Sequence, residues 1–170
     1  MDTFTQQLRD WQVFYTAVTT SAVTLVGLLF VSLSLRMEKF RRQSESLTLR
    51  LARESFGDFL YLLMLGLVFL VPHQVPLGLA VALFVLGLSR GIGVLHQLWA
   101  SARSGALGRK GFNFLREILL PGLVAVVLIF VSVEVARGDM VSLFGLVIVI
   151  AALLGSASWN AWRILVEGEI

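Results

Sequence analysis

The sequence contains no cysteine, only three prolines and only two histidines among its 170 residues. The lack of cysteine excludes disulfides, thiolate metal sites, iron–sulfur clusters and cysteine nucleophiles. Charged residues are also scarce, at 15% of the chain, whereas hydrophobic residues make up 57% and the mean hydropathy is +0.85. A water-soluble core could not hide that much apolar surface, so the composition predicts an integral membrane protein.

Patterns typical of enzymes are missing as well. The chain has no HExxH motif, no intramembrane aspartyl pair, no phosphate-cradling glycine loop and no plausible Ser/His/Asp arrangement. His73 and His96 are expected on opposite sides of the membrane, so they cannot share a metal or a haem within one chain. The net charge of +3 does not predict nucleic-acid binding, because the basic residues flank apolar runs. We therefore expect no enzyme, no cofactor, no metal site and no nucleic-acid partner.

Apolar segments of bilayer length recur along the chain, and each would cross as a helix of roughly 20 residues. Four are clear, and the fifth, 59–71, is long enough only if its helix begins near Ser55. Two prolines, Pro72 and Pro76, would end that helix and begin the next. We predict a single all-α transmembrane domain over residues 1–170, a polytopic helix bundle with spans at about 13–35, 56–72, 77–99, 115–136 and 141–165.

Basic residues predict the orientation of these spans. With five crossings, the loop after the first span and the loop before the fourth lie on one side and carry ten basic residues between them. This positive-inside pattern places the N-terminus outside and the C-terminus in the cytoplasm. The alternative is that 59–71 only dips into the membrane, which leaves four spans. The polar leader of the chain is not basic, so a signal anchor is expected in place of a cleavable signal peptide.

The largest polar segment, residues 36–54, is expected to form a short basic hairpin in the cytoplasm. It is the candidate for contact with anionic lipid or with a partner protein, through Lys39, Arg41 and Arg42.

Ionisable residues within membrane spans are costly and are therefore candidates for function. Arg90 is the foremost, because it lies about nine residues from the cytoplasmic end of its span. It extends its head to the inner interface, pairs with a carboxylate, or faces a water-filled path. The partners at matching depth are Asp58 and Glu117.

Small and hydroxyl-bearing residues mark candidate helix contacts. The first span carries Thr16, Thr20, Thr24, Gly27 and Ser34 within a narrow sector, which is either an interhelical seam or a wet pore wall. Close helix packing is expected at two further pairs, Gly87 with Gly91 and Ala151 with Gly155.

The stretch TTSAVTLVGLLFVSLSLRMEKF, around Ala22 to Ser34, resembles the first transmembrane segment of uncharacterised small bacterial multi-pass membrane proteins with a GLLFVALSL-type core. The resemblance covers little more than one helix. It implies a protein of the bacterial cytoplasmic membrane and transfers no activity and no site residues.

Three functions fit these features. The first is a homo-oligomeric channel or pore for small ions, lined by the hydroxyl-bearing sector or by the face of Arg90. The second is a non-catalytic accessory or regulatory subunit that binds another membrane protein or anionic lipid. The third is a small transporter, for which only Arg90 offers polar chemistry near the required depth.

Overall fold

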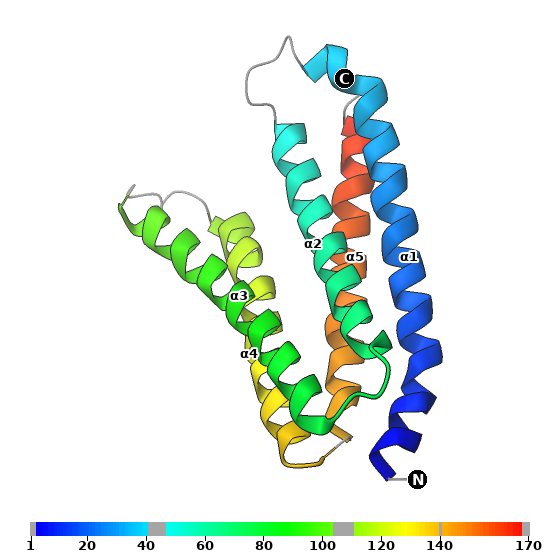
Figure 1. Cartoon of the computed structure of the whole chain (residues 1–170). Helices are drawn as coiled ribbons and strands as arrows, with labels where there is room; N and C mark the ends of the chain where they lie inside the picture. The colour runs from blue at the N-terminus through cyan, green and yellow to red at the C-terminus, as the bar shows by residue number, and fades with distance from the viewer. Residues whose placement is uncertain (1–2, 41–46, 104–110, 140, 168–170) are drawn as a thin grey trace. The chain divides into compact units, whose positions relative to one another are not determined.

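The computed structural model describes residues 3–40, 47–103, 111–139 and 141–167 (Figure 1). The side chains of residues 3–5, 7, 10 and 33 and those within 36–52, 111–117 and 163–167 lie outside the description. In the described part, all regular structure is helical, as the sequence predicts. The elements are α1 (Thr3–Phe40), α2 (Leu47–Leu70), α3 (Pro76–Arg103), α4 (Gly111–Ala136), the short 3-10 helix η2 (Val141–Leu143) and α5 (Phe144–Glu167).

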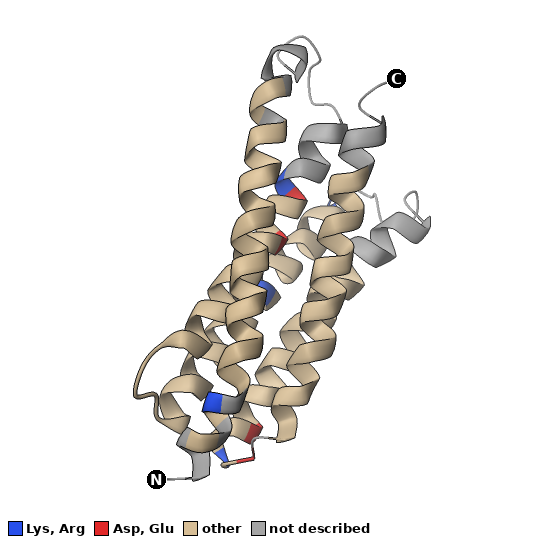
Figure 2. Ribbon diagram, turned by 90° about the vertical axis from the view of Figure 1, so that its right-hand side faces the viewer, with Lys and Arg blue, Asp and Glu red and all other residues tan. Residues whose placement is uncertain are grey.

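Four of the helices are long and apolar enough to cross a membrane, which makes the chain a multi-pass membrane protein. Their candidate spans are Trp11–Ser32, Pro76–Arg103, Ile118–Ala136 and Val141–Trp162. Charged residues occupy little of the described ribbon (Figure 2). Lipid-facing side chains must be apolar, and the exposed residues of these helices include many leucines, valines and phenylalanines.

The short predicted span belongs to α2, whose 24 residues measure about 36 Å at the helical rise. That length suffices for a bilayer. The helix is not among the four candidate spans, however, and its first half carries Arg53, Glu54 and Asp58 close together. A fifth crossing therefore stays a prediction, and so does the orientation of the termini that depends on it.

Prolines separate α2 from α3 as expected. α2 ends at Leu70, the turn contains Pro72, and Pro76 is the first residue of α3. Proline suits this first position because its missing amide has no partner within the helix. Within the turn, His73 adopts a positive φ of 54°, and the amide of Leu79 donates to the carbonyl of Val75 at 3.1 Å.

The chain divides into two compact units, and the boundaries fall inside α1, in the turn after α2 and inside α5. The α3–α4 unit consists of Met1–Thr5 and His73–Val149. The α1–α2 unit consists of Gln6–Pro72 and Ile150–Ile170. The expectation that residues 1–170 act as a single domain stays a prediction.

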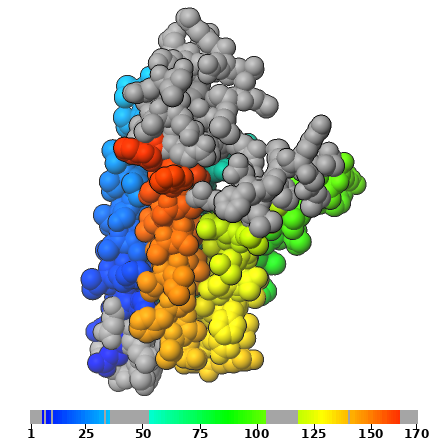
Figure 3. Space-filling model, turned by 180° about the vertical axis from the view of Figure 1, so that it is seen from behind, coloured from blue at the N-terminus to red at the C-terminus, as the bar shows by residue number. Residues whose placement is uncertain are grey.

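In the α3–α4 unit, the two long helices run antiparallel. Gly87 on α3 lies opposite Leu128 of α4, whereas Val94, two turns later on α3, lies opposite Gly122, earlier on α4. Gly145, at the start of α5, lies near Val127 and Val131 of α4. In Figure 3, the light-orange start of α5 accordingly adjoins the yellow atoms of α4. The core of this unit is apolar, with buried residues three or four apart on each helix, among them Leu79, Leu83, Val124, Leu128, Val131 and Val135.

Candidate functional site

The hydroxyl-bearing face of α1 lies on the surface of the protein. Thr16, Thr20 and Thr24 follow one another every fourth residue and are all exposed, as are Gly27 and Ser34. The hydroxyls of Thr16, Thr24 and Ser34 donate to carbonyl oxygens four residues earlier, at 2.7, 2.8 and 2.9 Å. Because the helix itself satisfies these hydroxyls, this face can meet apolar groups as well as water.

The other side of α1 is buried within the α1–α2 unit. Leu8, Tyr15, Ala22 and Leu29 recur every seventh residue, and all four are buried. The ring of Tyr15 lies parallel to that of Phe69 on α2, with centroids 3.6 Å apart and an interplanar angle of 2°. A seven-residue period keeps these side chains on one helix face, and the hydroxyl-bearing residues lie on the face turned away from it.

α1 and α2 approach each other closely at Gly66. A Cβ atom at this position would collide with Oγ1 of Thr19 and lie 3.2 Å from Thr19 Cβ. It would also lie 3.4 Å from the carbonyl oxygen of Tyr15, which accepts a 2.7 Å hydrogen bond from the Thr19 hydroxyl. Only glycine leaves room for this contact. Gly66 and Thr19 were not predicted from the sequence, because the residue pattern of one helix does not show which residues of a neighbouring helix lie opposite it.

Tyr15 carries a buried polar atom into this seam. Its hydroxyl oxygen is buried and has no hydrogen-bond partner within the described part of the chain. Aromatic neighbours on the same helix surround the ring, with Phe14 at 5.3 Å and Trp11 at 6.0 Å between centroids. A buried hydroxyl without a partner costs free energy, so the ring and not its hydroxyl stabilises this position.

Two polar residues of α2 lie in the interior of the same unit. Ser55 is fully buried, and its hydroxyl donates to the carbonyl oxygen of Ala157 on α5 at 3.3 Å. Asp58, one turn later on α2, is also buried. The sequence singled out Asp58 because a charge in a span is conspicuous, whereas a serine in a span is ordinary and Ser55 was missed.

The glycines of α3 face α4 at different distances. A Cβ at Gly87 would lie 3.0 Å from Ile129 Cγ1, 3.1 Å from Leu128 Cβ and 3.2 Å from the carbonyl oxygen of Ala125. At Gly91, the nearest atom would be Ala125 Cβ at 3.8 Å, an ordinary contact. The close approach of the helices in this seam therefore depends on Gly87 more than on Gly91.

Arg90 lies on α3 between these two glycines. Its side chain is half-buried, and the Nε atom of its guanidinium group is buried. Asp58, one of its predicted partners, belongs to the α1–α2 unit, and the side chain of Glu117 lies outside the described residues. The pairing of Arg90 with either carboxylate stays a prediction.

Other predicted contact residues are exposed or fall outside the description. A Cβ added at Gly27 or Gly155 would meet no described atom within 4 Å, and Ala151 is exposed. None of these three residues therefore lies in a close helix contact of the described part of the chain. The side chain of Lys39 and all of Arg41 and Arg42 lie outside the described residues.

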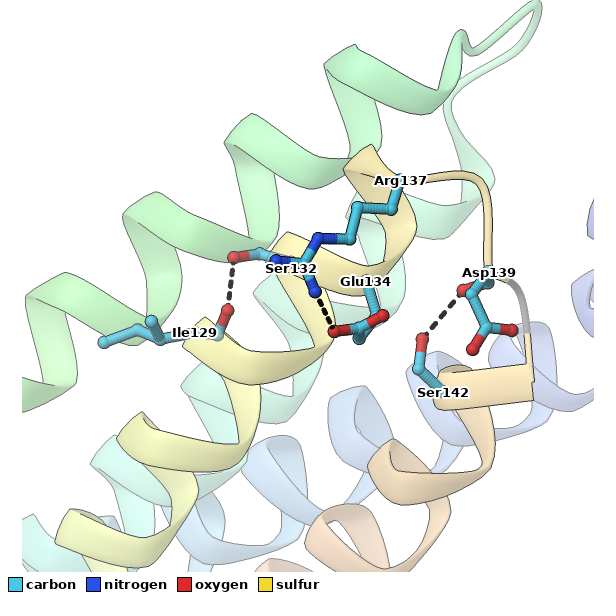
Figure 4. Close-up of polar contacts among 6 residues, drawn as sticks. All are labelled: Ile129, Ser132, Glu134, Arg137, Asp139 and Ser142. Carbon is cyan, nitrogen blue, oxygen red and sulfur yellow. Dashed lines mark hydrogen bonds and ion pairs between the residues drawn. The ribbon is translucent and has the colours of Figure 1, made fainter.

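Charged residues lie at the end of α4 and in the turn that leads to η2 (Figure 4). Arg137 donates to Glu134 with an Nη1–Oε1 distance of 2.8 Å. Gly138, with a φ of 92°, closes the helix, because its amide bonds to Val135 and the amide of Asp139 bonds to Glu134. Asp139 then accepts bonds from the amide of Val141, at its Oδ1, and from the hydroxyl of Ser142, at its carbonyl oxygen. These charges cap and join helices.

The described side chains offer few groups that could bind a metal ion or another polar ligand. Among the described residues, no group of three or more His, Asp or Glu side chains is placed to hold a metal ion. The features that stand out are the exposed hydroxyl-bearing face of α1 and the half-buried Arg90. Comparison of the chain with protein-family models, with curated proteins and with solved structures found no match.

Proposed function

We propose that this protein is a homo-oligomeric membrane channel for small ions, in which α1 from each copy contributes its hydroxyl-bearing face to the pathway. The observation that supports this proposal is the exposure of Thr16, Thr20, Thr24 and Ser34 along a helix of membrane-spanning length. In a monomer this face would contact lipid, where the hydroxyls find no further hydrogen-bond partner. Around a shared axis the same residues would form a narrow polar wall.

The details of the face suit an ion pathway. Its members are threonine, serine and glycine, which are small enough to let copies of α1 converge. They carry no charge, so they would replace part of the hydration of an ion without holding it tightly. A chain with so few polar residues could not easily enclose such a route alone, and oligomerisation solves that problem.

The test is to image the purified protein in nanodiscs for its stoichiometry and to measure ion flux after reconstitution into liposomes. We expect oligomers, and we expect Thr20→Trp to lower the flux at least about tenfold by filling the pathway, a change of roughly 1.4 kcal/mol in barrier height. Val81→Trp is the matched control, since Val81 is an exposed residue of α3. Flux that instead responds to Arg90→Glu and not to Thr20→Trp would move the pathway to α3.

A second candidate function is a non-catalytic accessory subunit of another membrane protein. It is favoured by the hydrogen bonds of Thr16, Thr24 and Ser34 to their own helix, which let an apolar helix of another protein cover this face without cost to the hydroxyls. A monomer in lipid that passes no ions, and that co-purifies with one membrane protein in an α1-dependent manner, would establish this function in place of the channel. Either function is proposed for the bacterial cytoplasmic membrane, on the resemblance of the first span.

A further inference from the structure

The last turn of α3 carries an aromatic–cation pair. The guanidinium carbon of Arg103 lies 3.6 Å from the centroid of the Trp99 ring. Residues four apart share a helix face, and here both side chains are exposed. The indole of Trp99 covers one side of the guanidinium group of Arg103 and restrains it. Because the Arg103 side chain is exposed, its N–H groups remain available to a ligand.

This pair ends an exposed ridge that changes character along α3. Leu88, Ile92 and Leu95 are exposed aliphatic residues at spacings of three and four. His96 and Trp99 follow on the same face, and Arg103 comes last. A helix that leaves a bilayer meets acyl chains, then the interface, then headgroup phosphates, and this order of side chains matches that sequence of environments.

We propose that this end of α3 binds the headgroup phosphate of an anionic phospholipid, with Arg103 as the ion-pairing group and Trp99 as the platform that holds it. Guanidinium groups bind phosphate through two parallel N–H bonds, which a restrained side chain forms at a smaller entropic cost. Charge complementarity favours an anionic lipid, since α3 contains no acidic residue that would compensate Arg103. The site does not depend on the proposed channel or on the basic segment 36–54.

The test uses the full chain in mixed micelles that contain equal amounts of phosphatidylglycerol and phosphatidylcholine. Native mass spectrometry then gives the ratio of the two lipids that the protein retains. We expect Arg103→Ala to lower this ratio about fivefold, which corresponds to about 1 kcal/mol for one basic residue at an anionic surface. Trp99→Leu should lower it as well, and Arg103→Lys should give an intermediate value because the planar contact is lost while the charge remains.

Two matched variants serve as controls. Arg9→Ala removes an exposed arginine from α1, and Trp159→Leu removes a tryptophan that is 56% exposed, against 55% for Trp99. Both should leave the ratio unchanged. An equal loss in Arg9→Ala would show that overall charge and not this site selects the lipid, and an unchanged ratio in Arg103→Ala would refute the site outright. If the single variants Arg103→Lys and Trp99→Leu both kept the wild-type lipid ratio, the role of Trp99 as a platform would be refuted.

Discussion

Two of the helix seams in the described structure each include a glycine at close approach, yet the atoms that meet these two glycines differ in kind. In the α3–α4 unit, Gly87 meets aliphatic atoms of Leu128 and Ile129 and one carbonyl oxygen. In the α1–α2 unit, Gly66 meets a threonine hydroxyl, beside the parallel rings of Tyr15 and Phe69. The side chains that meet at Gly87 are aliphatic, whereas the side chain that meets Gly66 carries a hydroxyl that needs a hydrogen-bond partner.

This difference explains why the α3–α4 seam can be predicted from the sequence and the α1–α2 seam cannot. The α3–α4 seam lies under a glycine pair with a spacing of four, a pattern visible within one helix. The α1–α2 seam depends on a match between a glycine of one helix and a threonine of the other, which no single-helix pattern reveals. A Cβ at Gly87 would also stay at least 3.0 Å from its neighbours, which a shift of a few tenths of an ångström relieves. A Cβ at Gly66 would collide with the Thr19 hydroxyl, which is held by its bond to Tyr15.

Gly66→Ala should therefore have the largest effect on stability. The new Cβ would collide with Thr19 Oγ1, and relief requires the loss of the Thr19–Tyr15 hydrogen bond or separation of the helices. We expect the free energy of unfolding, measured by denaturant titration in mixed micelles, to fall by about 2–3 kcal/mol. Gly57→Ala is the control on the same helix, because a Cβ at Gly57 meets no described atom within 4 Å.

A double variant sharpens that result. Thr19→Ala removes the colliding oxygen, so Gly66→Ala should cost clearly less in its presence. Equal costs of Gly66→Ala with and without Thr19→Ala would mean that the two residues do not meet as described.

Gly87→Ala should have an intermediate effect. Its Cβ would lie 3.0–3.2 Å from Ile129 Cγ1, Leu128 Cβ and the carbonyl oxygen of Ala125, so α4 must shift by a few tenths of an ångström. We expect a loss of about 1–2 kcal/mol in the same assay. Gly93→Ala on the same helix should be neutral or stabilising by up to about 1 kcal/mol, since alanine favours helix and its Cβ would meet no described atom within 4 Å. If Gly87→Ala proved more damaging than Gly66→Ala, the contrast between a yielding and a rigid seam would be wrong.

Tyr15→Phe should have the smallest effect, and the opposite sign. The variant removes a buried hydroxyl that has no partner in the described structure while it keeps the ring on Phe69. We expect the free energy of unfolding to stay level or rise by up to about 1 kcal/mol. Tyr15→Leu, which abolishes the ring contact, should lower it by about 1 kcal/mol or more. A comparable loss in both variants would show that the hydroxyl is bonded.

Several levels of the fold follow from the sequence alone, because they depend on local chemistry. Long apolar runs specify helices of membrane length, and Pro72 and Pro76 specify where α2 and α3 separate. The exact ends are less predictable, since α1 and α2 continue past the apolar runs into polar residues that favour helix equally well. Length and composition also leave α2 ambiguous, because Arg53, Glu54 and Asp58 offset its apolar second half.

The candidate site was predictable only in part. The hydroxyl-bearing sector of α1 was visible as a four-residue period, but its exposure depends on which face the Tyr15 row buries. Small residues are ambiguous in the same way: Gly87 lies in a close contact, whereas Gly27 and Gly155 have open space beside them. The roles of Ser55, Thr19 and Gly66 all depend on a second helix, and a period within one helix contains no information on its neighbour.

The closed turn after α4 bears on how the chain enters the membrane during its synthesis. Only four residues separate α4 from η2, and three of them bond back to the end of α4 or forward to the next helix. Backbone groups that are already bonded need little water as they cross the apolar layer. The end of α4 and the start of α5, which belong to one compact unit, would thus enter the bilayer as one hydrogen-bonded turn in which Arg137 carries its own counter-ion, Glu134.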